Sequence, residues 1–233
     1  SRYIQDGARL LHSVTNYELH KGLYSGHNDH NYFEIAHTIR REFDQNGGIY
    51  RGMTLYSFVD NHDVDRLASK LRVKEHLSLV YALMYFLPGI PSIYYGSEWG
   101  IEGRKEGAND DPLRPALDLQ EMEKENPHPE LAGWIRTLAG IRKEHPEACS
   151  GAYRELYLTN RQYAFARIAE GGALAVALNN DQEQACSVRF PVPEQAEVYE
   201  DAVSGESFPV ENGQVTVPLA ACGCRILLPG AGR

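Results

Sequence analysis

Phe58-Val59-Asp60-Asn61-His62-Asp63 follows an apolar run and precedes a helix-like pattern. A strand that ends in polar side chains just before a helix is typical of parallel α/β folds. In closed barrels of this kind, the reactive side chains lie at the carboxyl ends of the strands. We therefore predict a strand at 54–59 whose tip presents the polar residues 61–63 to a functional site.

A second segment of the same kind lies further along the chain. Residues 88–100 read Pro-Gly-Ile-Pro-Ser-Ile-Tyr-Tyr-Gly-Ser-Glu-Trp-Gly. We predict a strand at 92–95, followed by a tight turn at Gly96, because glycine adopts positive φ without strain. The helical pattern at 73–84 must end before Pro88, which cannot continue a helix.

The rest of the first 147 residues also alternates between strand-like and helix-like segments. A short strand candidate lies at 13–17, and apolar residues at helical spacing occupy 31–43 and 131–141. Asn31, three residues before Glu34, predicts a capping box. The polar stretch that runs from Gly96 to Pro129 is too long for a simple connection, which indicates a functional loop. Residues 1–147 are thus expected to form an α/β unit with three parallel strands.

From residue 148 onward the pattern changes to short alternating strands separated by turn residues. This spacing predicts an antiparallel β-sandwich over residues 148–233. The expected strands are 154–158, 162–168, 173–179, 186–190, 196–200, 214–217 and 222–228.

Composition narrows the classes of function. The 233 residues carry a net charge of −9, so we expect no nucleic-acid partner and no anionic membrane partner. No apolar run is long enough to cross a bilayer. Residues 1–6 lack a signal-peptide pattern and suggest a chain cut from a longer one. The four cysteines have no zinc spacing and, as reduced thiols, favour a cytoplasmic location.

The segments 55–63 and 88–100, in this order, resemble strands 7 and 8 of the catalytic barrel in the α-amylase family of glycoside hydrolases. Residues 13–19 are similar to the family's strand 6, and the residues before them to the stretch after its strand 5. The resemblance implies a partial (β/α)8 TIM barrel, strands 6–8 with their helices, over residues 1–147. Residues 148–233 would be the family's C-terminal β-sandwich domain. Three strands cannot close a barrel of eight, so a fragment is expected.

The resemblance also assigns roles at the first strand tip. Asp63 matches the catalytic carboxylate that stabilises the transition state, and His62 matches a residue that binds the same sugar. Asn61 completes the motif and is expected on the substrate-binding side. On the residues alone, a capped turn between strand and helix explains 61–63 equally well.

In the loop after the second strand, Asp110 and Arg114 stand four residues apart and resemble a pair that grips sugar hydroxyls. Asp111 with Arg114 is the alternative register, and a solvated charged loop is the alternative to both.

Glu98 is expected to be a structural hydrogen-bond acceptor, because the family's proton donor comes from strand 5. The His- and Asn-rich residues 20–31 are expected to form a loop, either beside the substrate or as plain surface. We expect no metal site among those residues.

Glycoside hydrolysis with retention needs a carboxylate nucleophile and a carboxylic acid as proton donor. The family's nucleophile motif, Gly-x-Arg-x-Asp, and its strand-5 acid have no counterpart here. The sequence therefore predicts part of a retaining α-glucan-active hydrolase or transglycosylase that is inactive by itself. Its expected partners are an oligosaccharide or α-glucan substrate and the missing N-terminal half of the barrel. No cofactor is expected, and a calcium site would draw on residues of that missing half.

A different class of function stays open. Some relatives of the family have lost catalysis and act as scaffolds, although the intact 61–63 motif argues against this. The sandwich could instead act as a carbohydrate-binding module. Such a module needs exposed aromatic side chains, for which Tyr153, Tyr157 and Tyr199 are the candidates.

Overall fold

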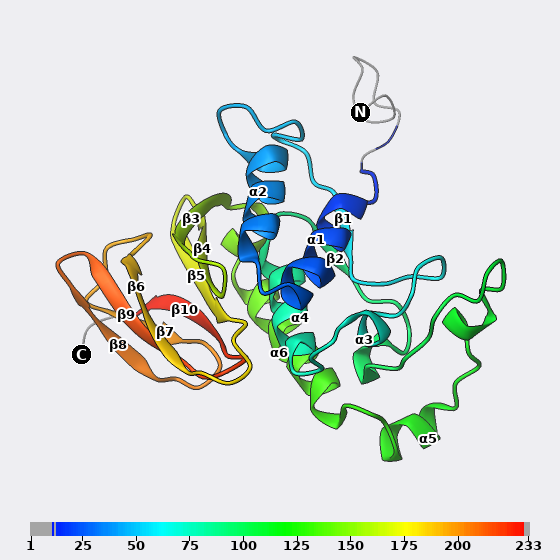
Figure 1. Cartoon of the computed structure of the whole chain (residues 1–233). Helices are drawn as coiled ribbons and strands as arrows, with labels where there is room; N and C mark the ends of the chain where they lie inside the picture. The colour runs from blue at the N-terminus through cyan, green and yellow to red at the C-terminus, as the bar shows by residue number, and fades with distance from the viewer. Residues whose placement is uncertain (1–10, 12, 231–233) are drawn as a thin grey trace.

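The computed structural model describes residue 11 and residues 13–230 (Figure 1). The inferences drawn above from residues 1–10, namely the missing signal pattern and the similarity to the chain after strand 5, lie outside the described residues. In the described part, no helix combines the length and the apolar character that a membrane span requires. An α/β part comes first and an antiparallel sheet follows it.

The elements of the α/β part, in chain order, have the following bounds: α1 (Tyr17–Asn28), α2 (Tyr32–Phe43), β1 (Tyr56–Phe58), α3 (Leu67–Lys70), α4 (His76–Phe86), β2 (Ile90–Ser92), the 3₁₀ turns η1 (Ser97–Trp99) and η2 (Asp111–Leu113), α5 (Leu119–Lys124), α6 (Pro129–Glu144) and α7 (Glu147–Ser150). Helix α4 is the centre of this part, since nearly all of its side chains are buried. The helices predicted at 31–43, 73–84 and 131–141 are confirmed as α2, α4 and α6.

The parallel sheet is short. Strands β1 and β2 pair in parallel, with Tyr56 opposite Ile90. On the other side of β1, the strand predicted at 13–17 is reduced to a single parallel bridge between Thr15 and Tyr56. Strand β2 begins and ends earlier than predicted, so that residues 93–96 already belong to its exit loop. The three segments nevertheless run parallel and in the predicted order.

Helix α1 replaces most of the loop that was predicted at 20–31, so that prediction is wrong. Asn16 caps the helix, because its Oδ1 accepts a 2.9 Å hydrogen bond from the Leu19 backbone N–H. Leu19 and Leu23 lie in the core, and so do His20 and His27. These histidines are therefore packing residues. The spacing of the two leucines is helical, but the polar composition around them concealed the signal.

The capping box predicted at the start of α2 is also wrong in its side-chain bonds. Asn31 is the N-cap residue, yet its side chain makes no capping hydrogen bond. The Glu34 carboxylate instead accepts a 2.6 Å hydrogen bond from Ser25 Oγ on α1. This bond joins α1 to α2 across their connection.

The C-terminal part is an eight-stranded antiparallel sheet in the order β3-β4-β5-β10-β7-β8-β9-β6. Residues from β4 and β5, such as Ala164 and Ala177, share one apolar core with Phe190 and Val217 from β6 and β9. The two ends of the sheet thus face each other as the two layers of the predicted sandwich. The bounds are β3 (Ala152–Leu158), β4 (Gln162–Ala169), β5 (Gly172–Asn179), β6 (Cys186–Pro191), β7 (Val198–Asp201), β8 (Ser207–Glu211), β9 (Gln214–Leu219) and β10 (Cys224–Gly230).

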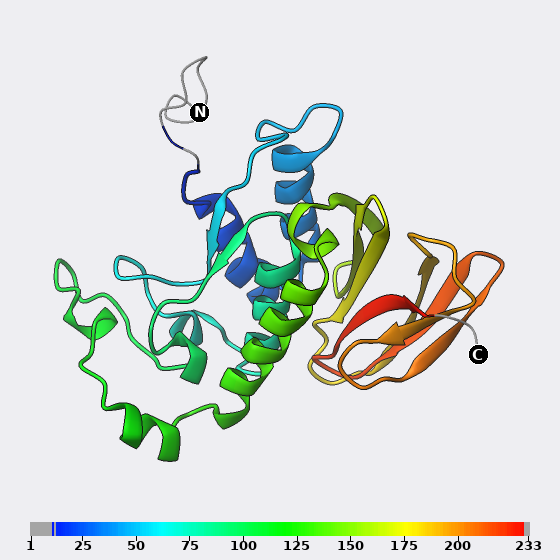
Figure 2. The ribbon, with the colours of Figure 1, turned by 180° about the vertical axis from the view of Figure 1, so that it is seen from behind.

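The two parts are joined through the outer face of β4 and β5. Phe165 and Val176 on these strands belong to the same buried cluster as the side chains of α4 and α2. In Figures 1 and 2, strands β3–β5 lie next to the helices, and the loop that carries α5 extends on the opposite side of the molecule. The loops that follow β1 and β2 therefore lie away from the C-terminal sheet.

Candidate active site

The chain turns sharply at the carboxyl end of β1. Asn61 Oδ1 accepts a 2.8 Å hydrogen bond from the Asp63 backbone N–H, which is an Asx turn, and Asn61 also forms a bridge to Val64. This turn leaves the side chains of His62 and Asp63 54% and 50% exposed. The capped-turn interpretation thus describes the Asn61 oxygen, while His62 and Asp63 face outward.

Four of the side chains singled out by the sequence form one charged cluster. His62 Nε2 lies 3.1 Å from Asp63 Oδ2, and Arg114 Nη2 lies 3.5 Å from Asp63 Oδ1. Arg114 Nη2 also lies 3.3 Å from Asp110 Oδ2, and Arg114 Nε donates a 3.3 Å hydrogen bond to the His62 carbonyl. Arg114 therefore connects the tip of β1 to the loop after β2. Asp110, the residue four before Arg114, is the one that makes this side-chain contact.

A further charged group, Lys105, lies at the edge of the cluster. Lys105 Nζ lies 2.8 Å from Asp110 Oδ1, so the two oxygens of Asp110 face two different cations. The Lys105 ammonium lowers the pKa of the Asp110 carboxyl below its ordinary value. Asp110 in turn raises the pKa of Lys105. From Lys105 through Asp110 and Arg114 to Asp63, positive and negative groups alternate.

A buried arginine holds together the loops that carry this cluster. Arg66 is fully buried and donates hydrogen bonds to the Tyr95 carbonyl at 2.7 Å, to Ser97 Oγ at 3.1 Å and to the Leu113 carbonyl at 2.7 Å. Its Cζ also lies 4.3 Å from the centre of the Tyr94 ring, a cation–π contact. One side chain thus fixes the exit of β1, the exit of β2 and the turn η2 relative to one another.

Asp60 makes a second buried connection between the two strand tips. Its Oδ2 accepts a 2.8 Å hydrogen bond from the Leu67 backbone N–H, and its Oδ1 accepts one of 2.5 Å from Ser97 Oγ. Asp60 is only 2% exposed, and this burial raises the pKa of its carboxyl above the ordinary value. At the polar tip of β1, Asp60 therefore faces inward and supports the loops, whereas Asp63 faces outward.

The exit of β2 follows the sequence prediction at one residue and departs from it at another. Gly96 has a φ of 83°, and a Cβ at this position would overlap the Ile101 side chain, so the predicted glycine turn is confirmed. Glu98 was expected to accept a structural hydrogen bond. Its Oε2 is buried and finds no partner among the described residues, so the expectation is wrong for this oxygen.

Other kinds of site find less support. Within residues 13–230, no group of three or more His, Cys, Asp and Glu side chains is arranged to hold a metal ion. The tyrosines considered as a sugar platform on the sandwich serve as packing residues. Tyr199 is buried, and Tyr153 and Tyr157 are half-buried. The Tyr153 hydroxyl also lies 2.6 Å from the hydroxyl of Tyr163.

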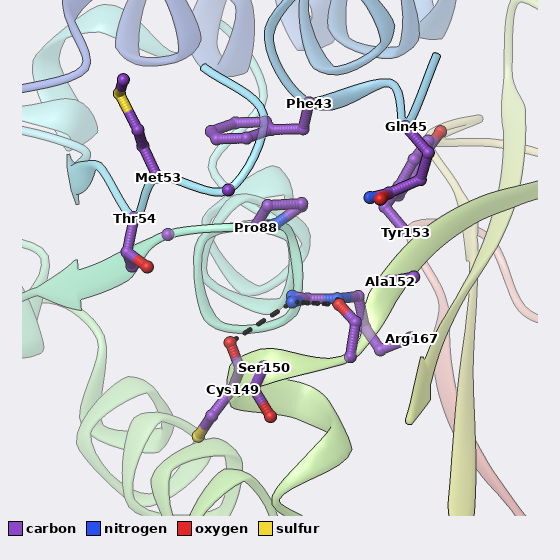
Figure 3. Close-up of a pocket in the computed structure, with 13 residues that line it drawn as sticks. Phe43, Gln45, Met53, Thr54, Pro88, Cys149, Ser150, Ala152, Tyr153 and Arg167 are labelled. Atoms are coloured by element: carbon purple, nitrogen blue, oxygen red, sulfur yellow. Dashed lines mark hydrogen bonds between the residues drawn. The ribbon is translucent and has the colours of Figure 1, made fainter. Parts of the chain in front are cut away.

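A pocket of about 340 Å³ lies at the opposite, amino ends of the strands (Figure 3). It is lined by Met53 before β1, by Pro88 before β2 and by Arg167 of the C-terminal sheet. The Arg167 guanidinium donates to the carbonyls of Gly151 at 2.8 Å and Phe86 at 2.9 Å. Burial lowers the pKa of Arg167 to about 10. This pocket is thus built around a joint between the two parts of the molecule and lies apart from the charged cluster.

Sequence reasoning did not find the residues that support the cluster. Arg66 belongs to no motif, and Asp60 and Ser97 lie within the segments 55–63 and 88–100 but received no role of their own. The available signal was position: Asp60 directly follows the apolar strand, and Ser97 directly follows the glycine turn. Arg66 gave no signal, because its partners lie 29 to 47 residues further along the chain.

The described architecture is a parallel α/β unit with polar residues at the carboxyl ends of its strands, joined to a C-terminal antiparallel β domain. The chain belongs to the α-amylase family of glycoside hydrolases. Residues 13–146 match the model of the alpha amylase catalytic domain, and residues 153–226 match the maltogenic amylase C-terminal domain. The recognition made from the two strand motifs is confirmed.

Individual proteins and solved structures are also similar to this chain. A cyclomaltodextrinase from Thermoanaerobacter pseudethanolicus (strain ATCC 33223 / 39E) is 32% identical over 133 residues, which cover 56% of this chain and 22% of that protein. The crystal structure of an α-amylase from Geobacillus thermoleovorans, complexed with acarbose, has a TM-score of 0.79 at 16% identity and covers 94% of this chain and 48% of that one. A cyclomaltodextrin glucanotransferase structure has a TM-score of 0.78 at 20% identity, with coverages of 97% and 45%. The chain thus spans about a fifth of the curated relative and about half of the two solved structures.

Proposed function

We propose that this chain forms one side of the active site of a retaining α-glucan-active hydrolase or transglycosylase. The observation that carries the proposal is the convergence of His62, Asp63, Asp110 and Arg114 beside the carboxyl ends of two parallel strands. Family membership and the acarbose complex of a structural neighbour support an oligosaccharide or α-glucan as the substrate.

In this proposal Asp63 stabilises the transition state. The sugar becomes oxocarbenium-like as the glycosidic bond breaks, and a fixed carboxylate opposes the positive charge that develops. His62, next to Asp63, donates a hydrogen bond to the same sugar. Asp110 and Arg114 bind its hydroxyl groups, for which they offer an acceptor and donors. Asn61 contributes through the turn that orients its two neighbours.

The nucleophile and the proton donor are proposed to come from further strands of the barrel. Tyr56 and Ile90 are neighbours in the parallel ladder, so their side chains lie on the same face of the sheet. They are 42% and 47% exposed, whereas parallel sheets are normally covered on both faces. This face fits the wall of a barrel whose other strands belong to the N-terminal half. The isolated chain is accordingly proposed to be inactive.

Two measurements test the proposal. The purified chain, incubated with maltodextrin, is expected to release no reducing sugar above a blank. A polypeptide that carries the complete barrel is expected to be active, and Asp63→Ala is expected to abolish that activity. Turnover by the isolated chain that depends on Asp63 would mean that both missing carboxylates lie within it. Full activity of Asp63→Ala in the complete barrel would overturn the proposed site.

A further inference from the structure

Lys105 lies in the long loop between β2 and α5, outside every motif considered above. We propose that Lys105 is a positioning residue of the sugar-binding cluster, which holds Asp110 so that Arg114 stays turned toward Asp63. The proposal rests on the function proposed above and adds a residue that none of the family motifs includes. Its basis is the way in which the loop presents Lys105 to Asp110.

The backbone fixes Lys105 beside Asp110. Glu106 and Asn109 form an antiparallel bridge and exchange two backbone hydrogen bonds of 3.1 and 3.0 Å. Lys105 and Asp110 are the residues that flank this small hairpin. The Lys105 backbone N–H also donates a 2.8 Å hydrogen bond to Asp65 Oδ1. The hairpin is thus anchored to the chain that follows β1, and the Lys105 ammonium reaches Asp110 Oδ1 at 2.8 Å.

Arg114 is shared between two carboxylates. Its Nη2 lies 3.3 Å from Asp110 and 3.5 Å from Asp63, and the difference is small. A carboxylate with no other cation nearby tends to take a guanidinium through both oxygens, as a bidentate pair. The Lys105 ammonium lies beside Oδ1 of Asp110, and Arg114 contacts Asp110 through Oδ2. The guanidinium therefore does not close onto Asp110 and remains oriented toward Asp63 and the His62 carbonyl.

Lys105 also supplies the charge that balances the cluster. Asp63 and Asp110 bring two negative charges, and Arg114 alone brings one positive charge. With Lys105 present, each carboxylate has a cation of its own, so Arg114 need not compensate both. The lowered pKa of Asp110 agrees with this, since its largest cause is the contact with Lys105.

Side-chain replacement with NMR detection tests the positioning role in the chain itself. Lys105→Met removes the cation and keeps most of the side-chain length, whereas Lys105→Arg keeps the cation. In Lys105→Met the pKa of the Asp110 carboxyl, followed by carbon-detected NMR, is expected to rise toward its ordinary value. The Arg114 Nε–Hε resonance is expected to shift as the guanidinium reorients. In Lys105→Arg both signals should stay close to their wild-type values. Lys124→Met, a matched change on the exposed side of α5, should alter neither signal.

Maltotetraose provides the functional readout. The complete barrel that carries Lys105→Met is expected to bind maltotetraose about two- to five-fold more weakly, the range of one exposed ion pair. In steady-state kinetics KM should rise by this factor while kcat changes little, because Lys105 orients binding groups and does not face the developing charge. Lys105→Arg should return KM close to the wild-type value.

The outcomes separate this proposal from the proposed function. An unchanged Asp110 pKa and an unchanged Arg114 resonance in Lys105→Met overturn the positioning role, whatever happens to the sugar. Wild-type affinity and KM in Lys105→Met also overturn it. If the wild-type complete barrel neither binds nor converts maltotetraose, the proposed function fails, while the two NMR readouts still decide whether Lys105 positions Asp110 and Arg114.

Discussion

The exposed charged cluster at the carboxyl ends of the parallel strands and the joint around Arg167 at their amino ends are built in opposite ways. At the carboxyl end, charged side chains pair with one another, and His62 and Asp63 stay 54% and 50% exposed. At the amino end, Arg167 is 2% exposed and donates to the backbone carbonyls of Phe86, Ala148 and Gly151. Exposed ion pairs add little stability, whereas a buried polar group that loses its partner is costly. The exposed cluster of His62, Asp63, Asp110 and Arg114 can therefore change with little loss of stability, whereas buried Arg167 cannot.

The largest effect is expected at the amino end. Arg167→Met should destabilise the fold by about 3 kcal/mol, because the buried carbonyls of Phe86 and Gly151 lose their side-chain donor. Arg189→Met, a matched change at an exposed position of β6, should stay within about 0.5 kcal/mol. Urea unfolding followed by circular dichroism measures both. Equal midpoints for the two variants would remove the contrast between the two ends.

At the carboxyl end, Asp63→Asn should show the opposite profile. In the complete barrel we expect kcat to fall at least ~100-fold, since the substitution removes a charge that acts mainly in the transition state. The free energy of unfolding should change by no more than about 0.5 kcal/mol, because the side chain is half exposed. Steady-state kinetics and urea unfolding on the same preparation test the pair of expectations. A near-normal kcat would return Asp63 to the role of a turn residue.

A third expectation concerns pH and the joint between the two parts. His30 Nδ1 and His76 Nε2 each lie 3.0 Å from the Asn180 carbonyl in the C-terminal part. The ring of His27, which is fully buried, is centred 5.3 Å from that of His76. Burial lowers the pKa of His27 from 6.5 to about 3 and also lowers the pKa of His76. Between about pH 3 and pH 6.5, the unfolded chain therefore binds more protons than the folded one.

Stability is therefore fully present above the unfolded pKa and falls as the pH drops through this window. Between pH 7 and pH 5, His27 alone should account for a loss of about 2 kcal/mol. Urea unfolding at both pH values measures it. His27→Gln should show a smaller loss than the wild type, and His37→Gln, at an exposed position of α2, should keep the full loss. The same pH dependence in His27→Gln and in the wild type would contradict the assignment to His27.

Local patterns in the sequence were enough for most of the C-terminal part. Period-two alternation predicted every strand of the sheet except β8, which is short and contains Pro209. A proline interrupts a strand pattern because it cannot donate to the ladder, and β8 was missed for this reason. In the α/β part, α1 was missed because His20 and His27 suggested a polar loop although both are buried. Composition proved misleading where polar side chains pack inside the fold.

The residues of the candidate site likewise fall into two groups, those that the sequence predicted and those that it did not. The motifs and the family resemblance singled out His62, Asp63 and the pair Asp110 and Arg114, and the structure brings these four together. Their supports could not be predicted, since they depend on contacts between distant loops. The hydrogen bond from Arg66 to the Leu113 carbonyl, for example, spans 47 residues. A single sequence carries no record of such a contact, because neither residue type is unusual at its position.

The smallest expected effect separates two residues within the cluster. His62→Asn removes the Nε2 donor next to Asp63 but no negative charge, and kcat in the complete barrel should fall only about 10-fold, the effect of one hydrogen bond of about 1.4 kcal/mol. His62 Nε2 lies 3.1 Å from Asp63, so part of its effect should pass through Asp63. The double variant with Asp63→Asn should then lose less activity than the product of the two single losses. Purely multiplicative losses would mean that His62 acts on the sugar independently. A loss in His62→Asn as large as that in Asp63→Asn would assign the decisive transition-state contact to the imidazole, since the carboxylate is intact in that variant.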